Sequence, residues 1–466
     1  MDKAYLILAD GTVFEGYSIG AKGKSIGETV FTTGMTGYIE TLTDPSYYGQ
    51  IVTQTFPLIG NYGVIKKDFE SKKSYVKGYI VRELCEKPSN FRCESTLSDF
   101  LKSQEIVGIA EIDTRKLTKI LREVGVMNGM IASGNEATRI ETALQNENEK
   151  EKLIAKIKEY KIEDAVKSVQ STDEALGIEN KTINQDVILD RDAPLVVLLD
   201  FGAKANIQRE LEKRGLSVKI VPYNTSAEEI ISFSPNGRML SNGPGDPAEN
   251  TTVIEEIKKL CEWNNAVIAS SANTARKDTR MAVANKTEGE MVACATNTAD
   301  GIVACATSTA SEIVAHTTNT ADGIAACATN TADGIAACAT NTATAKPIPI
   351  FGICLGHQML ALARGAKTCK LKYGHRGGNQ PVKDLDNGRV FITSQNHGYA
   401  VENDSLPPNA KLRFINTNDG TCEGIEYTDI PAFSVQFHPE ACGGPHDTNY
   451  LFDLFHDEVL RYSNVV

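Results

Sequence analysis

The sequence predicts an α/β protein with two folded regions. A mixed α/β amino-terminal domain spans about residues 1–150, and a doubly wound, mostly parallel sheet spans residues 193–466. Three observations support this prediction. Short β-like runs alternate with turn clusters in the first region. The second region opens on the apolar run of residues 194–199, which is typical of a strand buried on both faces of a parallel sheet. Residues 265–346 form an insert within it, and the second half of this insert is an 11-residue repeat that begins at Met291.

Length and charge narrow the classes of partner. A chain of 466 residues is long enough for two or three domains. The 48 Lys and Arg against 60 Asp and Glu give a net charge of −12, which argues against binding nucleic acid or an anionic membrane through bulk electrostatics. No run approaches the 18 apolar residues of a membrane span, and the eleven cysteines form no CxxC pair. We therefore expect a cytoplasmic protein with reduced thiols.

The amino-terminal elements follow from short β-like runs and one capped helix. Strands are expected over residues 4–8, 28–33, 50–56 and 76–84. Asp113 or Thr114 is a plausible N-cap for a helix with Leu117 and Leu121 on one face, and Gly125 would end it. Residues 151–192 are charged and helical in pattern, so we expect a connector packed on one side only.

The carboxyl-terminal region repeats the strand, helix, strand order of a βαβ unit. An amphipathic helix over 206–215 separates strands at 194–200 and 217–224, and a helix over 251–264 precedes the strand at 347–353. A doubly wound sheet of this kind binds its ligand at the carboxyl ends of the strands. Further strands are expected at 389–395, 411–417, 423–428 and 431–437, before a final helix over 449–462.

The insert has an unusual composition. Its 82 residues contain no Leu, Pro, Phe, Tyr or Trp, so little apolar surface offsets the entropy of ordering. Disorder or a loosely packed excursion is the favoured interpretation, and a stacked solenoid or a long helix stays open. Four cysteines recur in the repeat and would bind a metal only if its turns stacked; they are Cys294, Cys305, Cys327 and Cys338. Because the insert precedes the amino end of a parallel strand, we expect it to leave the site intact.

A nucleophile motif follows the strand at 347–353. Cys354 stands between Gly352 and Gly356 at a strand-to-helix turn, the arrangement of a nucleophile elbow. The glycines leave room for the tight turn, and the N-terminus of the next helix favours the thiolate. The alternative is a small buried cysteine in a glycine-rich turn.

Two further motifs supply the partners that a thiol nucleophile needs. His438 follows the strand at 431–437 as a candidate base, and Glu440 could hold its imidazole in the right tautomer. Residues 241–247, SNGPGDP, can present backbone N–H groups to an oxyanion or a substrate carboxylate. Taken alone, the first motif could be a capped strand end and the second a turn.

Together these motifs resemble the class I (triad) glutamine amidotransferase domain. The remainder of the chain resembles the small, glutamine-hydrolysing chain of carbamoyl-phosphate synthetase, through residues 31–63 (FTTGMTGYIETLTDPSYYGQIVTQTFPLIGNYG), 108–131 and 198–211. This resemblance covers nearly the whole chain outside the insert. The amino-terminal match separates this family from other amidotransferases that share the triad.

The resemblance implies a mechanism and a partner. Cys354 would attack the side-chain amide of L-glutamine to form a γ-glutamyl thioester, His438 would move the protons, and Glu440 would orient His438. Ammonia would pass to a large subunit that makes carbamoyl phosphate with ATP and Mg²⁺, for arginine and pyrimidine synthesis. The small chain itself would need no cofactor or metal. Glutamine would lie among eight residues, with Ser46 and Gln358 at its polar end: Ser46, Gly243, Gly245, Leu355, Gln358, Asn396, Gly398 and Tyr399.

Other functions remain open at this stage. A γ-glutamyl hydrolase or cysteine peptidase would use the same Cys and His, and a scaffold subunit disabled by the insert would keep the motifs without activity. The sequence Gly23-Lys24-Ser25 lacks the glycine that a phosphate-binding loop needs, because Ser18 occupies that position. His375 and His446 have no metal-ligand spacing, so we expect the non-catalytic histidines to be structural.

Overall fold

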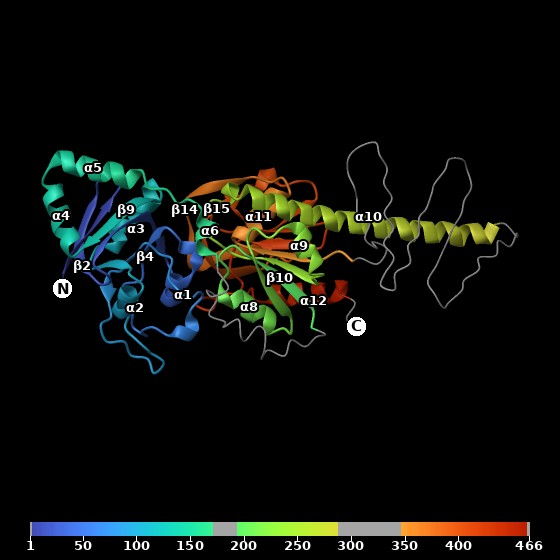
Figure 1. The fold of residues 1–466 in the computed structure, drawn as a ribbon, viewed down its shortest axis with the longest axis horizontal. Coiled ribbons are helices and arrows are strands. Elements are labelled where there is room, and N and C mark those ends of the chain that lie inside the picture. The colour runs from blue at the N-terminus through green and yellow to red at the C-terminus, as the bar shows by residue number, and fades with distance from the viewer. Residues whose placement is uncertain (1, 171–192, 288–345, 464–466) are drawn as a thin grey trace, which may run out of the picture. The chain divides into compact units, whose positions relative to one another are not determined.

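The computed structural model describes residues 2–170, 193–287 and 346–463 (Figure 1). The chain divides into two compact units, Met1–Glu262 with Ile348–Val466, and Trp263–Pro347. The first unit contains a closed barrel and a nine-stranded sheet. Within the described residues, no helix combines the length and the apolar character needed to cross a membrane.

The amino-terminal domain is built around a closed barrel of seven strands in the order β1-β2-β8-β6-β4-β3-β9. The β3–β4, β4–β6 and β6–β8 pairs are parallel, and the other pairs are antiparallel. The barrel strands are β1 (Lys3–Leu8), β2 (Val13–Ser18), β3 (Gly23–Thr32), β4 (Gln50–Gln54), β6 (Gly78–Ile80), β8 (Val107–Ala110) and β9 (Met127–Ser133). Outside the barrel, β5 (Leu58–Ile59) pairs with β7 (Glu83–Leu84).

The helices of this domain are α1 (Tyr38–Thr43), α2 (Leu97–Ser103), α3 (Thr114–Val124), α4 (Asn135–Leu144), α5 (Glu147–Lys158) and α6 (Ala165–Val169). The expected capping of α3 is confirmed, because the Asp113 side chain accepts a hydrogen bond from the Lys116 amide and Gly125 ends the helix. Helix α5 packs on β1 and β9. The predicted connector therefore begins inside a helix of the barrel domain, and its residues 171–192 lie outside the described residues.

The carboxyl-terminal domain has one sheet in the order β11-β10-β12-β13-β18-β17-β16-β14-β15. The five strands from β11 to β18 are parallel, as the βαβ pattern predicts, and the other four extend the sheet in antiparallel pairs. The strands are β10 (Leu195–Asp200), β11 (Ser217–Pro222), β12 (Gly237–Leu240), β13 (Ile350–Ile353), β14 (Thr368–Asp384), β15 (Val390–Val401), β16 (Ala410–Asn416), β17 (Cys422–Tyr427) and β18 (Ala432–Val435).

The core of this domain forms between the sheet and its helices, α8 (Ala205–Glu212), α9 (Ala227–Ser232), α11 (Leu355–Ala363) and α12 (Tyr450–Tyr462). Phe351 on β13 stacks on Phe433 of β18 at 4.4 Å between ring centroids and meets Phe452 of α12 edge-on. This apolar cluster holds in place the two parallel strands that lead to Cys354 and His438.

Helix α10 (Thr251–Thr287) runs from the first unit into the second. The expectation that the helix ends near residue 264 is wrong. Residues 265–287 contain neither Gly nor Pro and are rich in Ala, Lys and Arg, so nothing in their composition stops a helix. The 11-residue repeats, residues 291–345, and their four cysteines lie outside the described residues.

Candidate active site

Cys354 occupies the elbow that the sequence predicts. It ends β13 and precedes α11 with φ 54° and ψ −103°, a conformation that non-glycine residues rarely adopt. A Cβ atom on Gly356 would lie 2.3 Å from the Leu240 carbonyl oxygen, and one on Gly352 would lie 2.9 Å from the Gly356 carbonyl oxygen. Both flanking glycines are therefore required by close backbone contacts.

The base follows the neighbouring parallel strand. The His438 amide donates to the Ser394 carbonyl at 2.9 Å, which fixes the chain just beyond β18. His438 Nδ1 lies 2.7 Å from Glu440 Oε1, and both side chains are buried. His438 Nε2 has no hydrogen-bond partner among the described residues. An imidazole whose Nδ1 is held by a carboxylate leaves Nε2 to exchange a proton with the nucleophile.

The electrostatics favour a charged imidazole. Burial and the Lys204 cation lower the pKa of His438, but the charges of Glu440 and Cys354 raise it by more, so this pKa lies above its ordinary value. Burial raises the pKa of Glu440, yet His438 and Lys204 hold it well below the ordinary carboxyl value. The site therefore suits an imidazolium held by the Glu440 carboxylate.

Lys204 is a functional candidate that sequence reasoning missed. Its ammonium lies 3.1 Å from His438 Nδ1, 3.3 Å from Glu440 Oε1 and 3.5 Å from Asp44 Oδ2, and only 8% of the residue is exposed. Burial lowers the pKa of Lys204, but Asp44, Glu440 and Glu70 raise it by more, so the lysine is charged. The signal was a lysine in the sequence FGAKAN, directly after a buried strand.

The amino-terminal domain contributes to the same site. Ser46 stands in the 3-10 turn η1 (Pro45–Tyr47), and its Oγ accepts a hydrogen bond from Asn242 Nδ2 at 2.9 Å. Asp44 accepts from the Ser46 amide and, at 3.2 Å, from Asn396 Nδ2. These bonds link residues of the amino-terminal domain to the loop after β12 and to β15.

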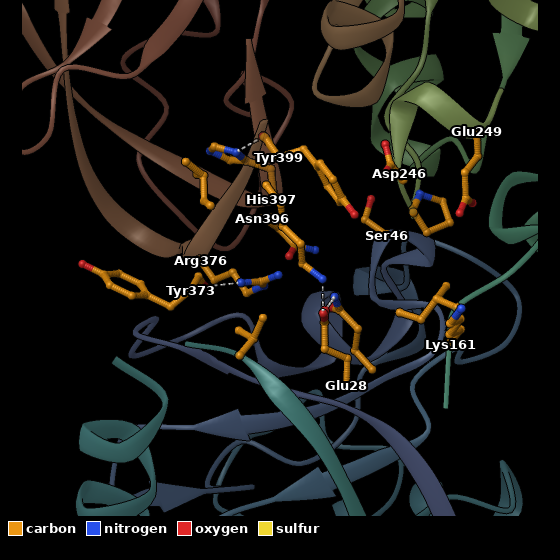
Figure 2. A pocket seen from close by; sticks show the side chains of 18 of the residues that line it. Glu28, Ser46, Lys161, Asp246, Glu249, Tyr373, Arg376, Asn396, His397 and Tyr399 are labelled. Carbon is orange, nitrogen blue, oxygen red and sulfur yellow. Dashed lines mark hydrogen bonds and ion pairs between the residues drawn. The ribbon is translucent and has the colours of Figure 1, made fainter. Parts of the chain in front are cut away.

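A cavity of about 470 Å³ gathers most of the predicted residues (Figure 2). Cys354 lines it together with seven of the eight predicted glutamine contacts: Ser46, Gly243, Gly245, Gln358, Asn396, Gly398 and Tyr399. Leu355 is absent from the lining, although its backbone amide follows the nucleophile at the start of α11. The cavity is large enough for a small ligand.

The local bonds qualify the prediction for Gln358. Gln358 Nε2 donates to the Tyr399 carbonyl at 2.7 Å and to Gln436 Oε1 at 2.8 Å, so its amide nitrogen holds β15 in place. Gln358 can therefore offer a substrate only its amide oxygen. The Cys354 thiol lies 3.7 Å from the Asn396 carbonyl oxygen, which places the nucleophile beside the same strand.

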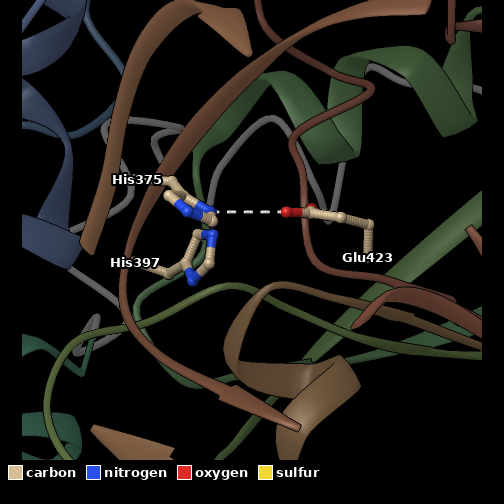
Figure 3. Close-up of side chains that lie close together, drawn as sticks. All are labelled: His375, His397 and Glu423. Atoms are coloured by element: carbon tan, nitrogen blue, oxygen red, sulfur yellow. Dashed lines mark ion pairs between the residues drawn. The ribbon is translucent and has the colours of Figure 1, made fainter. Parts of the chain in front are cut away.

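His375, His397 and Glu423 form a buried cluster whose ligand atoms lie within 4.8 Å of one another (Figure 3). Hydrogen bonds already engage these groups. His375 contacts Asp419 at 2.8 Å and Glu423 at 3.4 Å. His397 Nδ1 lies 2.7 Å from the Tyr399 carbonyl. Burial lowers the pKa of His375, but Asp419 and Glu423 raise it to about 9. A metal would have to displace these bonds, so the cluster fits the expected structural role of His375 better than a metal site.

The geometry places Cys354 and the buried His438–Glu440 pair after two adjacent parallel strands, the arrangement expected of a cysteine-nucleophile amidotransferase. Comparison with protein families agrees. The model of the class-I glutamine amidotransferase matches residues 197–269 and 307–458. The model of the carbamoyl-phosphate synthase small chain, CPSase domain, matches residues 6–131.

Individual relatives extend the match over nearly the whole chain. The carbamoyl phosphate synthase small chain of Listeria monocytogenes serotype 4b (strain F2365) is 41% identical over 98% of this chain and 96% of the relative. That of Clostridium perfringens (strain 13 / Type A) is 42% identical over 97% and 98%. A solved glutamine amidotransferase from Thermotoga maritima covers 57% of this chain and 84% of its own, with 15% identity and a TM-score of 0.29. The chain belongs to the carbamoyl phosphate synthase small chain family.

Proposed function

We propose that this chain hydrolyses L-glutamine at Cys354 and supplies the ammonia to a large synthetase subunit. The observation that carries the proposal is the buried contact of 2.7 Å between His438 and Glu440 beside a strained cysteine elbow. Membership of the small chain family and the matched amidotransferase domain support the same activity. Nothing favours a scaffold without activity, and the presence of Cys354, His438 and Glu440 supports the enzyme.

The first half of the reaction forms a thioester. The Cys354 thiolate attacks the γ-carbonyl carbon of glutamine, and the electron pair of the C=O bond moves to oxygen. The Leu355 amide at the start of α11 and the backbone around Gly243 are the donors available to this oxyanion. When the C–N bond breaks, the leaving nitrogen takes the proton of His438 Nε2 and departs as ammonia, which leaves a γ-glutamyl thioester and a neutral imidazole.

The second half releases glutamate. A water molecule gives a proton to His438 as its oxygen attacks the thioester carbonyl, and collapse of the intermediate expels the thiolate. Glutamine and water thereby become glutamate and ammonia, and the imidazolium and thiolate are restored. Glu440 keeps the Nδ1 proton in place through both halves and stabilises the imidazolium.

Ammonia needs a route away from the site. A second cavity of about 80 Å³ is lined by His438, Lys204 and Glu70 and shares Asn396 with the first cavity. Burial raises the pKa of Glu70 to about 7. In this proposal ammonia leaves through that cavity to the large subunit, which carries out the ATP-dependent synthesis of carbamoyl phosphate.

The test is glutamate release from glutamine by the purified chain, measured with and without a large synthetase subunit. The proposal predicts release that requires Cys354, is abolished in Cys354→Ser, and rises when the large subunit is present. Equal release by Cys354→Ser would overturn the catalytic assignment. Release that the large subunit leaves unchanged would overturn the partner assignment.

A further inference from the structure

Arg376 on β14 is a buried cation without a buried counter-charge. It is 4% exposed, and no carboxylate of the described residues lies within ion-pair distance of it. The buried lysine of the site differs. Lys204 lies between Asp44 and Glu440. Burying an unpaired positive charge is costly, so a site that keeps one normally binds an anionic group of its ligand.

The hydrogen bonds of Arg376 leave most of its guanidinium unused. Nη1 donates to the Tyr373 carbonyl at 2.6 Å, and Nε has no partner among the described residues. Glu28 is near enough to affect the pKa of Arg376, but its carboxylate already contacts Lys370 at 2.8 Å and Gln50 at 3.0 Å. The guanidinium is thus anchored at one nitrogen and can donate from the others.

Arg376 faces the cavity that contains the nucleophile. It lines that cavity with Cys354 and Ser46, and its side chain extends among those of Asn396 and Glu28 (Figure 2). In the β14–β15 register it pairs with Asn396. A Cβ atom on Gly398 would lie 3.3 Å from Arg376 Nη2, so the guanidinium packs directly against the strand segment expected to hold glutamine.

The charges of this part of the site suit an amino acid. Burial lowers the pKa of Arg376, and the charges of Glu28, Tyr47 and Cys354 oppose this effect. The cavity wall also carries the acidic side chains of Asp246 and Glu249. A zwitterionic amino acid can therefore meet a cation and carboxylates in one cavity.

We propose that Arg376 binds the α-carboxylate of the amino-acid substrate and makes the site specific for an amide that carries one. The reacting γ-amide is neutral, so the α-carboxylate is the only anionic group of glutamine. A guanidinium matches a carboxylate in charge and in the geometry of its paired N–H groups. This inference rests on the proposed glutaminase function and adds a residue to it.

The experiment compares two substrates in three variants of the full chain with its large subunit. The substrates are L-glutamine and 4-aminobutanamide, which is glutamine without the α-carboxylate, and the readout is kcat/KM from product release. Arg376→Met removes the charge, and Arg376→Lys keeps the charge without the paired N–H groups of the guanidinium. Lys372→Met is the control, because it removes an exposed cation from the same strand. Competitive inhibition by L-glutamate and by 4-aminobutanoate is measured in parallel, because it reports binding even where turnover of the amide is slow.

We expect Arg376→Met to lower kcat/KM for glutamine and the affinity for glutamate by roughly 100-fold, mainly through KM, because a charged hydrogen bond is lost. Values for 4-aminobutanamide and 4-aminobutanoate should stay within about threefold. Arg376→Lys should recover part of the loss, and Lys372→Met should match the wild type.

Two results would overturn the role of Arg376. Equal losses for both substrates would assign Arg376 to folding or to the Cys354 thiolate, and a shifted pH dependence of Cys354 alkylation would identify the latter. Unchanged glutamine kinetics in Arg376→Met would exclude any role in binding. If the wild type does not hydrolyse glutamine at all, the proposed function itself fails. Loss of activity in the Arg376 variants alone leaves the proposed function standing.

Discussion

Replacing Glu440 with Gln tests how the triad is charged. The carboxylate lies 2.7 Å from His438 Nδ1, and the site is fully buried. With charge centres ~4 Å apart and an effective dielectric constant of ~20, the lost attraction is about 4 kcal/mol. Each 1.4 kcal/mol is a factor of ten, so kcat/KM for glutamine should fall by about 1000-fold, or about 100-fold if the new amide keeps the hydrogen bond.

The pH dependence gives the sign of the effect. Glu440 raises the pKa of His438, whereas burial and Lys204, which remain in the variant, lower it. Loss of Glu440 must therefore lower this pKa, so the imidazolium loses its proton at a lower pH. We expect the alkaline limb of the kcat/KM profile of Glu440→Gln to move towards neutral pH.

The assay is glutamate release against pH for the wild type, Glu440→Gln and a control, Glu426→Gln, which alters a partly exposed carboxylate on β17. The control should behave as the wild type. A loss of less than tenfold in Glu440→Gln, with the alkaline limb unmoved, would refute the view that Glu440 stabilises a charged His438.

Three further predictions concern the elbow, the histidine cluster and the insert. Gly356→Ala places a methyl group 2.3 Å from the Leu240 carbonyl oxygen, so it should destabilise the fold by about 1–3 kcal/mol and abolish most activity. An unchanged free energy of unfolding in denaturant would contradict the steric argument. The pKa of His375 is about 9 in the fold, so its contribution to stability is full below pH 6.5 and is lost as pH rises through 9. The loss of unfolding free energy in His375→Gln, at most about 3 kcal/mol, should therefore shrink between pH 6 and 9.5. A loss that does not depend on pH would exclude a charged His375. Replacing residues 265–346 with a short flexible linker should leave glutaminase activity within a few-fold, because closure entropy grows only logarithmically with loop length, and a collapse or a large gain of activity would show that the insert acts on the site.

Local sequence signals predicted the backbone well where they were strong. Continuous apolar runs correctly predicted β10 and β13, and the side-chain cap at Asp113 correctly predicted the start of α3. Strand β14 was missed because Gly374 and Gly377 interrupt it, and its register with β15 shifts on both sides of 375–377. The helical continuation of α10 was missed because the repeat composition was extended back to residue 265.

The sequence motifs predicted the nucleophile, base and carboxylate of the candidate site, but not its buried cations. Cys354, His438 and Glu440 stand at strand ends that the βαβ pattern brings together. The sequence signal for Lys204 was weak and Arg376 had none, because a lysine or an arginine in a sequence is usually on the surface. Their burial and their distant partners are known only from the folded structure.

The central claim, that Cys354 forms a covalent intermediate with the γ-acyl group of glutamine, is tested most directly by peptide mass spectrometry of enzyme that is quenched in acid during turnover and digested in acid. The account predicts a γ-glutamyl adduct on the peptide that contains Cys354, present only while glutamine remains and absent in Cys354→Ser. Steady glutamate release with no adduct on that peptide, or release that persists in Cys354→Ser, would contradict it.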